Sequence, residues 1–122
     1  VVAVAFDGGE ASRRALDLAA RFASVGDSTV HLIHANADPA AGSRVVGQAE
    51  ARLSLQQVAF VTHVEAGRPG AVAARVAART RCDALFVGAH VARDTPRRPS
   101  PVLVSHAEEI LRHTDIPVVV QP

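Results

Sequence analysis

The residues of this chain that could do chemistry lie where apolar runs end. Val1–Phe6 is a continuous apolar run, and Asp7, Gly8 and Gly9 end it abruptly. A carboxylate at that point could accept a hydrogen bond from a ribose or a purine edge, and the two glycines would let a ligand approach the backbone. Asp7 could equally cap the following helix while the glycines supply a tight turn. The two interpretations are compatible, and the residues alone leave both open.

A second candidate site follows the apolar run that ends at Gly88. From there the chain passes through a proline-rich loop to Ser105, which forms an S-x-x-E capping box with Glu108 at the start of a helix. The positive end of that helix is a ready site for phosphate. The sequence therefore indicates an anion-binding position near Ser105.

The loop between these points, residues 92–101, carries three prolines and three arginines. Without a large apolar side chain it cannot bury enough surface to offset the entropy of ordering. We expect it to be mobile without ligand and open to proteases near Arg97 and Arg98. If it folds over a phosphate, its arginines add charge-assisted contacts; otherwise they only keep a solvated loop soluble.

Several familiar sites are excluded by the motifs. The adjacent glycines after Asp7 do not form G-x-G-x-x-G, and a chain whose basic residues are all arginine has no P-loop lysine. None of the six histidines has the spacing of a metal site on a helix, and His31 and His34 should point to opposite faces of a strand. Cys82 has no C-x-x-C partner and should pack as a small hydrophobe. We therefore assign no catalytic residue and no metal ligand.

Length and composition limit the class of protein further. The 122 residues allow one domain, residues 1–122, and a net charge of +1 gives no general attraction to DNA or anionic lipid. With neither Trp nor Tyr, the chain has no stacking platform for single-stranded nucleic acid. The single cysteine fits a reducing cytosol, and no apolar run is long enough to span a bilayer. From the apolar run that starts at Val1 we expect no signal peptide. We expect a cytoplasmic protein that has neither nucleic acid nor a membrane as its partner.

Strand and helix patterns alternate along the chain, which predicts an α/β fold with a parallel sheet. Strands are expected at residues 1–6, 29–35, 59–65, 84–87 and 117–121. Helices are expected at residues 10–24, 43–57 and 71–80 and from Ser105, with Gly26 ending the first and a loop at 38–42. Ligands of such folds bind beyond the carboxyl ends of the strands, which is where the candidate residues above lie.

In this order and spacing, the segments resemble the universal stress protein family. The resemblance is carried by Val4–Leu16, His31–Ala35, the turn Glu65–Pro69, Cys82–His90, Ser105–His113 and Ile116–Val120. It spans nearly the whole chain except residues 37–58, where this protein is shorter than most members. It implies a three-layer α/β/α sandwich with a five-stranded parallel sheet of order 3-2-1-4-5, of the adenine nucleotide α-hydrolase-like kind, and a homodimer.

The resemblance also implies a nucleotide site. In ATP-binding members, phosphates and ribose lie on a G-x-x-G-x9-G-[ST] loop after the fourth strand, of which Gly88 matches the first glycine and Ser105 the closing serine. Val91 and Val104 stand at the second and third glycine positions, with twelve residues between them instead of nine. Side chains there would crowd the approach of phosphate to the backbone. ATP is therefore the candidate ligand, but no cofactor is assigned with certainty, and the non-binding branch of the family is the better match.

On the base side, the resemblance places Asp7 at the adenine and Ala35 on the purine wall. The complete candidate nucleotide site is Asp7, Ala35, Gly88, His90, Val91 and Ser105.

Three functions stay open at this level. The first is a homodimeric stress-response domain that acts by binding rather than catalysis, with weak or absent ATP binding. The second is an adenine-nucleotide-binding or slowly ATP-hydrolysing member with a rebuilt phosphate loop. The third is an ATP-pyrophosphatase-like enzyme, which ranks last because residues 7–12 lack the first serine and the inner aspartate of its S-G-G-x-D-S loop.

The end of the chain predicts how the dimer forms. If the strand order follows the family, Pro117–Val120 is an edge strand with no charge and no covering element after it, which is an association hazard for a monomer. Antiparallel pairing with a second copy would satisfy its backbone. Pro117 lacks an N–H, so we expect pairing through Val118, Val119 and Val120, and we expect Val119→Pro to remove a donor from the pairing.

Overall fold

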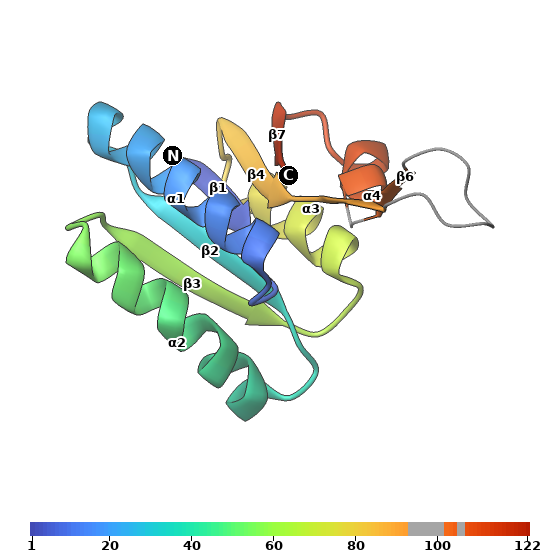
Figure 1. The fold of residues 1–122 in the computed structure, drawn as a ribbon, viewed down its shortest axis with the longest axis horizontal. Helices are drawn as coiled ribbons and strands as arrows, with labels where there is room; N and C mark the ends of the chain where they lie inside the picture. The colour runs from blue at the N-terminus through green and yellow to red at the C-terminus, as the bar shows by residue number, and fades with distance from the viewer. Residues whose placement is uncertain (93–101, 105–106) are drawn as a thin grey trace.

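The computed structural model describes residues 1–92, 102–104 and 107–122, with the backbone alone for 90–92, 102–104 and 107–108. Most of the loop expected to be mobile and the capping residue Ser105 lie outside the described residues. Five strands form one parallel sheet in the order β3-β2-β1-β4-β7, which confirms the predicted order 3-2-1-4-5 (Figure 1). They are β1 (Val2–Ala5), β2 (Val30–Ala35), β3 (Phe60–Glu65), β4 (Ala84–Gly88) and β7 (Val118–Gln121).

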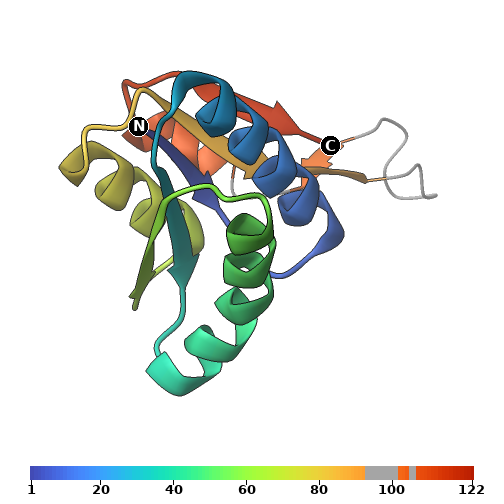
Figure 2. The ribbon, with the colours of Figure 1, turned by 90° about the vertical axis from the view of Figure 1, so that its left-hand side faces the viewer.

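Helices cover both faces of this sheet, so the three-layer sandwich is confirmed. On one face lie α1 (Glu10–Gly26) and α2 (Pro39–Leu55), side by side in Figure 2. On the other lie α3 (Pro69–Arg79) and α4 (Ala107–His113). The strands are apolar on both faces because both are covered, as is usual in parallel sheets.

Each face of the sheet has its own hydrophobic core. Leu16 of α1 and the strand residues Leu32 and Phe86 are fully buried on the side covered by α1 and α2. A row of buried alanines in α1 lets that helix approach the strands closely. Val76 and Ile110 are fully buried on the α3 and α4 side. Cys82 is buried in this second core, as predicted, and burial raises the pKa of its thiol.

Several helix boundaries differ from those predicted, most clearly the end of α1 and the start of α2. Gly26, expected to stop α1, is its last helical residue, and Asp27 takes the left-handed conformation (φ 49°) and donates its N–H to the carbonyl of Ala23. The loop expected at 38–42 was wrong, because α2 already begins at Pro39. The Asp38 side chain caps this helix by accepting the N–H of Ala40 at 3.0 Å, and proline suits the first helical position because it has no N–H to leave unpaired.

A two-stranded ribbon departs from the end of β4, where a loop was predicted. It consists of β5 (His90–Ala92) and β6 (Val102–Val104), which pair antiparallel with His90 opposite Val104 (Figure 1). Both segments contain valine and no proline, so each can take part in a ladder.

Across the described part of the chain, every helix is too short or too polar to cross a bilayer.

Candidate functional site

A pocket opens at the carboxyl ends of β1, β2 and β4, where the sequence analysis placed the site. It brings together three of the candidate residues, Asp7, Ala35 and Gly88. Among the described residues, it is also lined by Ala5, Phe6, Ser12, Ile33, Pro69 and Val87. Its volume is about 30 Å³. Pockets that hold small-molecule ligands usually measure roughly 300–1,000 Å³, so this one has room for little more than a water molecule.

Asp7 is held in place by its own turn and by the first turn of α1. Its Oδ1 accepts the N–H of Gly9 and the hydroxyl of Ser12, each at 2.7 Å. In return, the N–H of Asp7 points to the Ser12 hydroxyl at 3.3 Å. Both side-chain bonds go to the same carboxylate oxygen, so the direction of the carboxylate is fixed before any ligand arrives.

The alternative role for Asp7, capping α1, is corrected by this geometry. The N-cap of α1 is Gly9, and no side chain caps this end of the helix. The bond from Gly9 to Asp7 instead closes a turn of the Asx type. Gly8 supplies the tight turn, as expected, with a φ of 85° that L side chains rarely adopt.

Gly88 lies under the first turn of α1. A Cβ at this position would stand 2.4 Å from the carbonyl carbon of Ala11 and 2.4 Å from the nitrogen of Ser12. Both atoms belong to the helix backbone, so neither can move without moving the helix. Packing alone therefore requires a glycine here, whether or not phosphate binds.

The N-terminus of α3 lies beside the pocket and is already bound by a side-chain carboxylate. Glu109 of α4 accepts the N–H of Ala71 at 3.1 Å and pairs with Arg68 at 3.4 Å. Gly70 permits this approach, since a Cβ there would stand 2.8 Å from the side chain of Glu109. The carboxylate satisfies the positive helix terminus that a phosphate would otherwise use.

The structure does not test whether the remaining candidate residues reach the pocket, because their side chains lie outside what it describes. His90 and Val91 lie in β5, where Val91 is opposite Leu103, and only their backbone is described. Ser105 lies outside the described residues. Ser12 and Pro69 line the pocket and were not singled out from the sequence. Ser12 could have been found from the sequence, because it carries a hydroxyl only five residues after Asp7.

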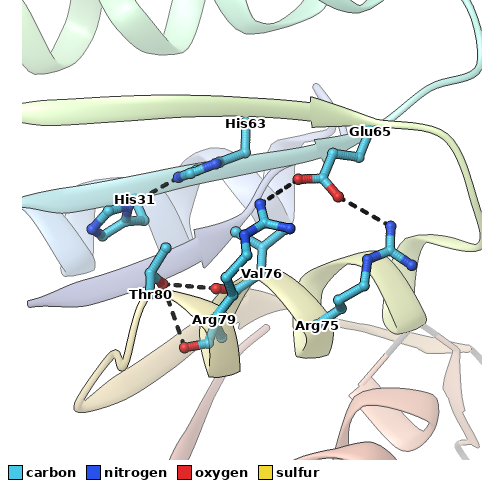
Figure 3. A network of polar contacts seen from close by, with 8 residues as sticks. His31, His63, Glu65, Arg75, Val76, Arg79 and Thr80 are labelled. Atoms are coloured by element: carbon cyan, nitrogen blue, oxygen red, sulfur yellow. Dashed lines mark hydrogen bonds and ion pairs between the residues drawn. The ribbon is translucent and has the colours of Figure 1, made fainter.

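A second polar cluster lies on the α3 side of β2 and β3 (Figure 3). The Nδ1 of His31 and the Nε2 of His63 are 2.9 Å apart. Glu65, at the end of β3, binds Arg75 at 3.1 Å and also binds Arg79. The register explains the pair, because His63 lies opposite Ile33, two residues along the same face from His31.

Burial and the neighbouring charges both act on the two histidines of this cluster. Burial lowers the pKa of His31, and the neighbouring His63 lowers it further. Burial and the positive charge of Arg79 lower the pKa of His63. The hydrogen bond from Arg79 also lowers the pKa of Glu65.

His34 has a different environment on the opposite face of β2, as predicted. It is buried, and its Nδ1 lies 2.8 Å from the carbonyl of Phe6, to which it donates. Within residues 1–92, 102–104 and 107–122, no three histidine, cysteine or acidic side chains converge to hold a metal ion.

A parallel sheet of this order, with helices on both faces and a pocket at its switch point, defines a three-layer, doubly wound α/β protein. The model of the universal stress protein family matches residues 1–122, so the chain belongs to that family. No curated protein matches it.

Solved structures of the family are similar to this chain over nearly their whole length. A family member from Burkholderia pseudomallei is 22% identical with a TM-score of 0.74, and the match covers 99% of this chain and 95% of that one. A universal stress protein in complex with cAMP is 22% identical with a TM-score of 0.80, covering 99% and 94%. The protein from Archaeoglobus fulgidus in complex with dAMP is 16% identical with a TM-score of 0.78, covering 99% and 96%.

Proposed function

We propose that this protein is a cytoplasmic, homodimeric stress-response domain, formed by residues 1–122, that acts by binding rather than by catalysis. We further propose that it binds ATP more weakly than roughly 100 μM, which corresponds to about −5.5 kcal/mol. The observation that carries the proposal is the 30 Å³ pocket, which is too small for a purine as it stands. The buried thiol of Cys82 fits a reducing compartment.

Three features of the chain support weak binding. The first turn of α1 lies directly on Gly88, so enlarging the pocket there requires the helix to move. Glu109 already occupies the N-terminus of α3, and its negative charge repels phosphate. Val91 and Val104 stand where ATP-binding relatives have glycine.

A second candidate function is adenine-nucleotide binding through a rebuilt phosphate loop. The fixed carboxylate of Asp7 favours it, because a preorganised acceptor costs less to use. The complexes of family members with cAMP and dAMP favour it as well. In this proposal the site is Asp7, Ala35, Gly88, His90, Val91 and Ser105.

Isothermal titration calorimetry with ATP, AMP and cAMP separates the two candidates. We expect every dissociation constant to exceed about 100 μM; low-micromolar binding of any of the three would replace the first proposal by the second. In that case Asp7→Asn should weaken binding. Asp38→Asn is the matched control, because Asp38 is also a turn carboxylate that accepts a backbone N–H, but it does not line the pocket.

The proposed dimer is supported by the direction of the backbone groups in β7. Leu85 and Ala89 of β4 donate to the carbonyls of Pro117 and Gln121. Since alternate residues of a strand point to opposite sides, Val119 also bonds to β4, whereas Val118 and Val120 direct their N–H and C=O groups to the open edge. The substitution expected to remove a donor from the pairing, Val119→Pro, would therefore break a bond to β4 instead.

The two ends of β7 select the register of the pair. Pairing Val118 with Val120 of a second copy, in both directions, uses all four outward groups of each strand. Shifting the register either way would bring Ile116, beyond the strand, or Pro122, which has no N–H, opposite an outward residue. The two-fold axis then passes through Val119.

Sedimentation equilibrium tests this dimer. We expect a mass near twice 12.7 kDa for the unmodified protein. Val120→Pro should give a folded monomer, because it removes an outward N–H and edge strands tolerate proline. Val120→Thr keeps the N–H and the branched shape and should stay dimeric. A concentration-independent monomer for the unmodified protein would refute the proposal.

A further inference from the structure

A stripe of apolar side chains on α1 faces solvent in the single chain. It consists of Leu18, Phe22 and Val25, spaced at i, i+4 and i+7 along one face of the helix. Leu18 is half-buried, whereas Phe22 is 58% exposed and Val25 is 92% exposed. With Arg21 and Gly26, these residues line a shallow groove on the surface. Contiguous exposed apolar residues of this kind mark interaction surfaces.

The stripe lies on the side of α1 that borders the open edge strand β7. The opposite side of the helix faces α2, since Asp17 forms two hydrogen bonds with Arg52, at 2.9 and 2.7 Å. One turn before Leu18, on the same face as the stripe, Arg14 donates from Nε to the carbonyl of Pro122 at 2.7 Å. That carbonyl follows the end of β7. The helix therefore runs beside the edge strand, and its apolar stripe continues the surface of that edge.

Phe22 lies level with the middle of the edge strand. Its ring centroid is 5.3 Å from that of Phe86 in β4, and Phe86 is paired in register with Val119. The side chain of Val119 packs on the same face of the sheet as these rings. The central residue of the stripe and the central residue of the edge strand are thus at the same height.

We infer that the Leu18–Phe22–Val25 stripe is the second half of a self-complementary interface, and that its partner is a second copy of this chain. The inference rests on the proposed pairing of β7 and adds the helical surface to it. A two-fold axis through Val119 turns α1 of the second copy antiparallel to the first. Phe22 then faces its own copy, and Val25 faces Leu18 of the other chain, because they lie three residues after and four residues before Phe22.

The spacing of a continuous sheet fits these side chains. α1 lies mainly over β4 and also contacts the strands on either side of it, β1 and β7, so the two copies of α1 would be separated by about three strand spacings, or about 14 Å. Packed helices lie roughly 8–10 Å apart, so small residues would leave a gap between them. Leu18, Phe22 and Val25 are large enough to fill this gap, and filling it would explain why they are exposed in the single chain.

Val25→Glu is the substitution that tests the stripe. Val25 is almost fully exposed, so the fold of one chain does not depend on it. Leu55→Glu is the matched control, since Leu55 is 84% exposed, also lies at the end of a helix, and belongs to α2, away from β7. Dissociation constants come from sedimentation equilibrium at several protein concentrations, and far-ultraviolet circular dichroism verifies that each variant is folded.

We expect Val25→Glu to raise the dimer dissociation constant at least tenfold and Leu55→Glu to leave it unchanged. If Val120→Pro dissociates the dimer but Val25→Glu does not, the stripe inference is wrong and the strand pairing stands. If Val25→Glu dissociates the dimer but Val120→Pro does not, the axis through Val119 is wrong and the inference fails with it. A monomeric unmodified protein overturns both.

Discussion

Replacing Gly88 by alanine tests whether this glycine serves packing. The added Cβ would stand 2.4 Å from two backbone atoms of α1, whereas ordinary contacts begin near 3.4 Å, so the first turn of the helix would have to retreat by about 1 Å. Ala11 and Ser12 in that turn are buried, and the shift would disturb their contacts. Overpacking of this kind costs roughly 1–3 kcal/mol, and the backbone clash places Gly88→Ala near about 3 kcal/mol. That is a large part of a total stability of roughly 5–15 kcal/mol.

Urea denaturation without nucleotide, at one fixed protein concentration, measures this loss of unfolding free energy. Gly47→Ala is the matched control with the opposite sign. Gly47 lies inside α2 with open space around its Cβ position, so alanine there should stabilise the protein by roughly 0.5–1 kcal/mol. A free energy for Gly88→Ala within about 0.5 kcal/mol of the unmodified protein would refute the packing argument and return Gly88 to a role in binding.

Two further predictions concern stability. Because the pKa values of His31 and His63 are lowered in the folded protein, the unfolded chain takes up protons first as pH falls through about 6.5, so the free energy of unfolding should fall between pH 7.5 and 5.5. Urea titrations at these pH values should show a smaller fall for His63→Gln; an unchanged pH dependence would contradict the role of the pair. Asp38→Ala removes the N-cap of α2 and should lower the free energy of unfolding by about 1 kcal/mol in the same assay. Asp38→Asn, which keeps a cap oxygen, should retain most of that stability. Equal stability of Asp38→Ala and the unmodified protein would contradict this prediction.

The order of the elements could be predicted from the sequence because it depends on local patterns. Apolar runs bounded by glycine or acidic residues mark the strands, and the family resemblance supplied their order in the sheet. The start of α2 was missed because aspartate followed by proline and small residues also indicates a turn. Only the bond from Ala40 to Asp38 shows that the aspartate is an N-cap.

From the sequence, only the site residues at the ends of strands could be predicted to lie together. Asp7 follows β1 and Ala35 is the last residue of β2, so their meeting in one pocket follows from a parallel sheet. The contact of Ser12 with Asp7 depends on the left-handed turn at Gly8, and the His31–His63 pair depends on the register of β2 and β3. The glycines predict a tight turn, but neither its left-handed geometry at Gly8 nor the register of the two strands follows from residue spacing alone.

Gly88 and Asp7 both suggested nucleotide binding from the sequence, but the structure supports that role for only one of them. Gly88 is fully explained by the backbone of α1 above it, so a glycine at this position is no evidence for phosphate. Asp7 is different, since the helix has its own N-cap at Gly9 and does not need the carboxylate for that purpose. Ser12 nevertheless donates a hydroxyl to Asp7 and fixes its direction at the rim of the pocket. Because a fixed acceptor favours a ligand with a matching donor, the argument for a nucleoside at this site rests on Asp7 and Ser12 rather than on the glycine.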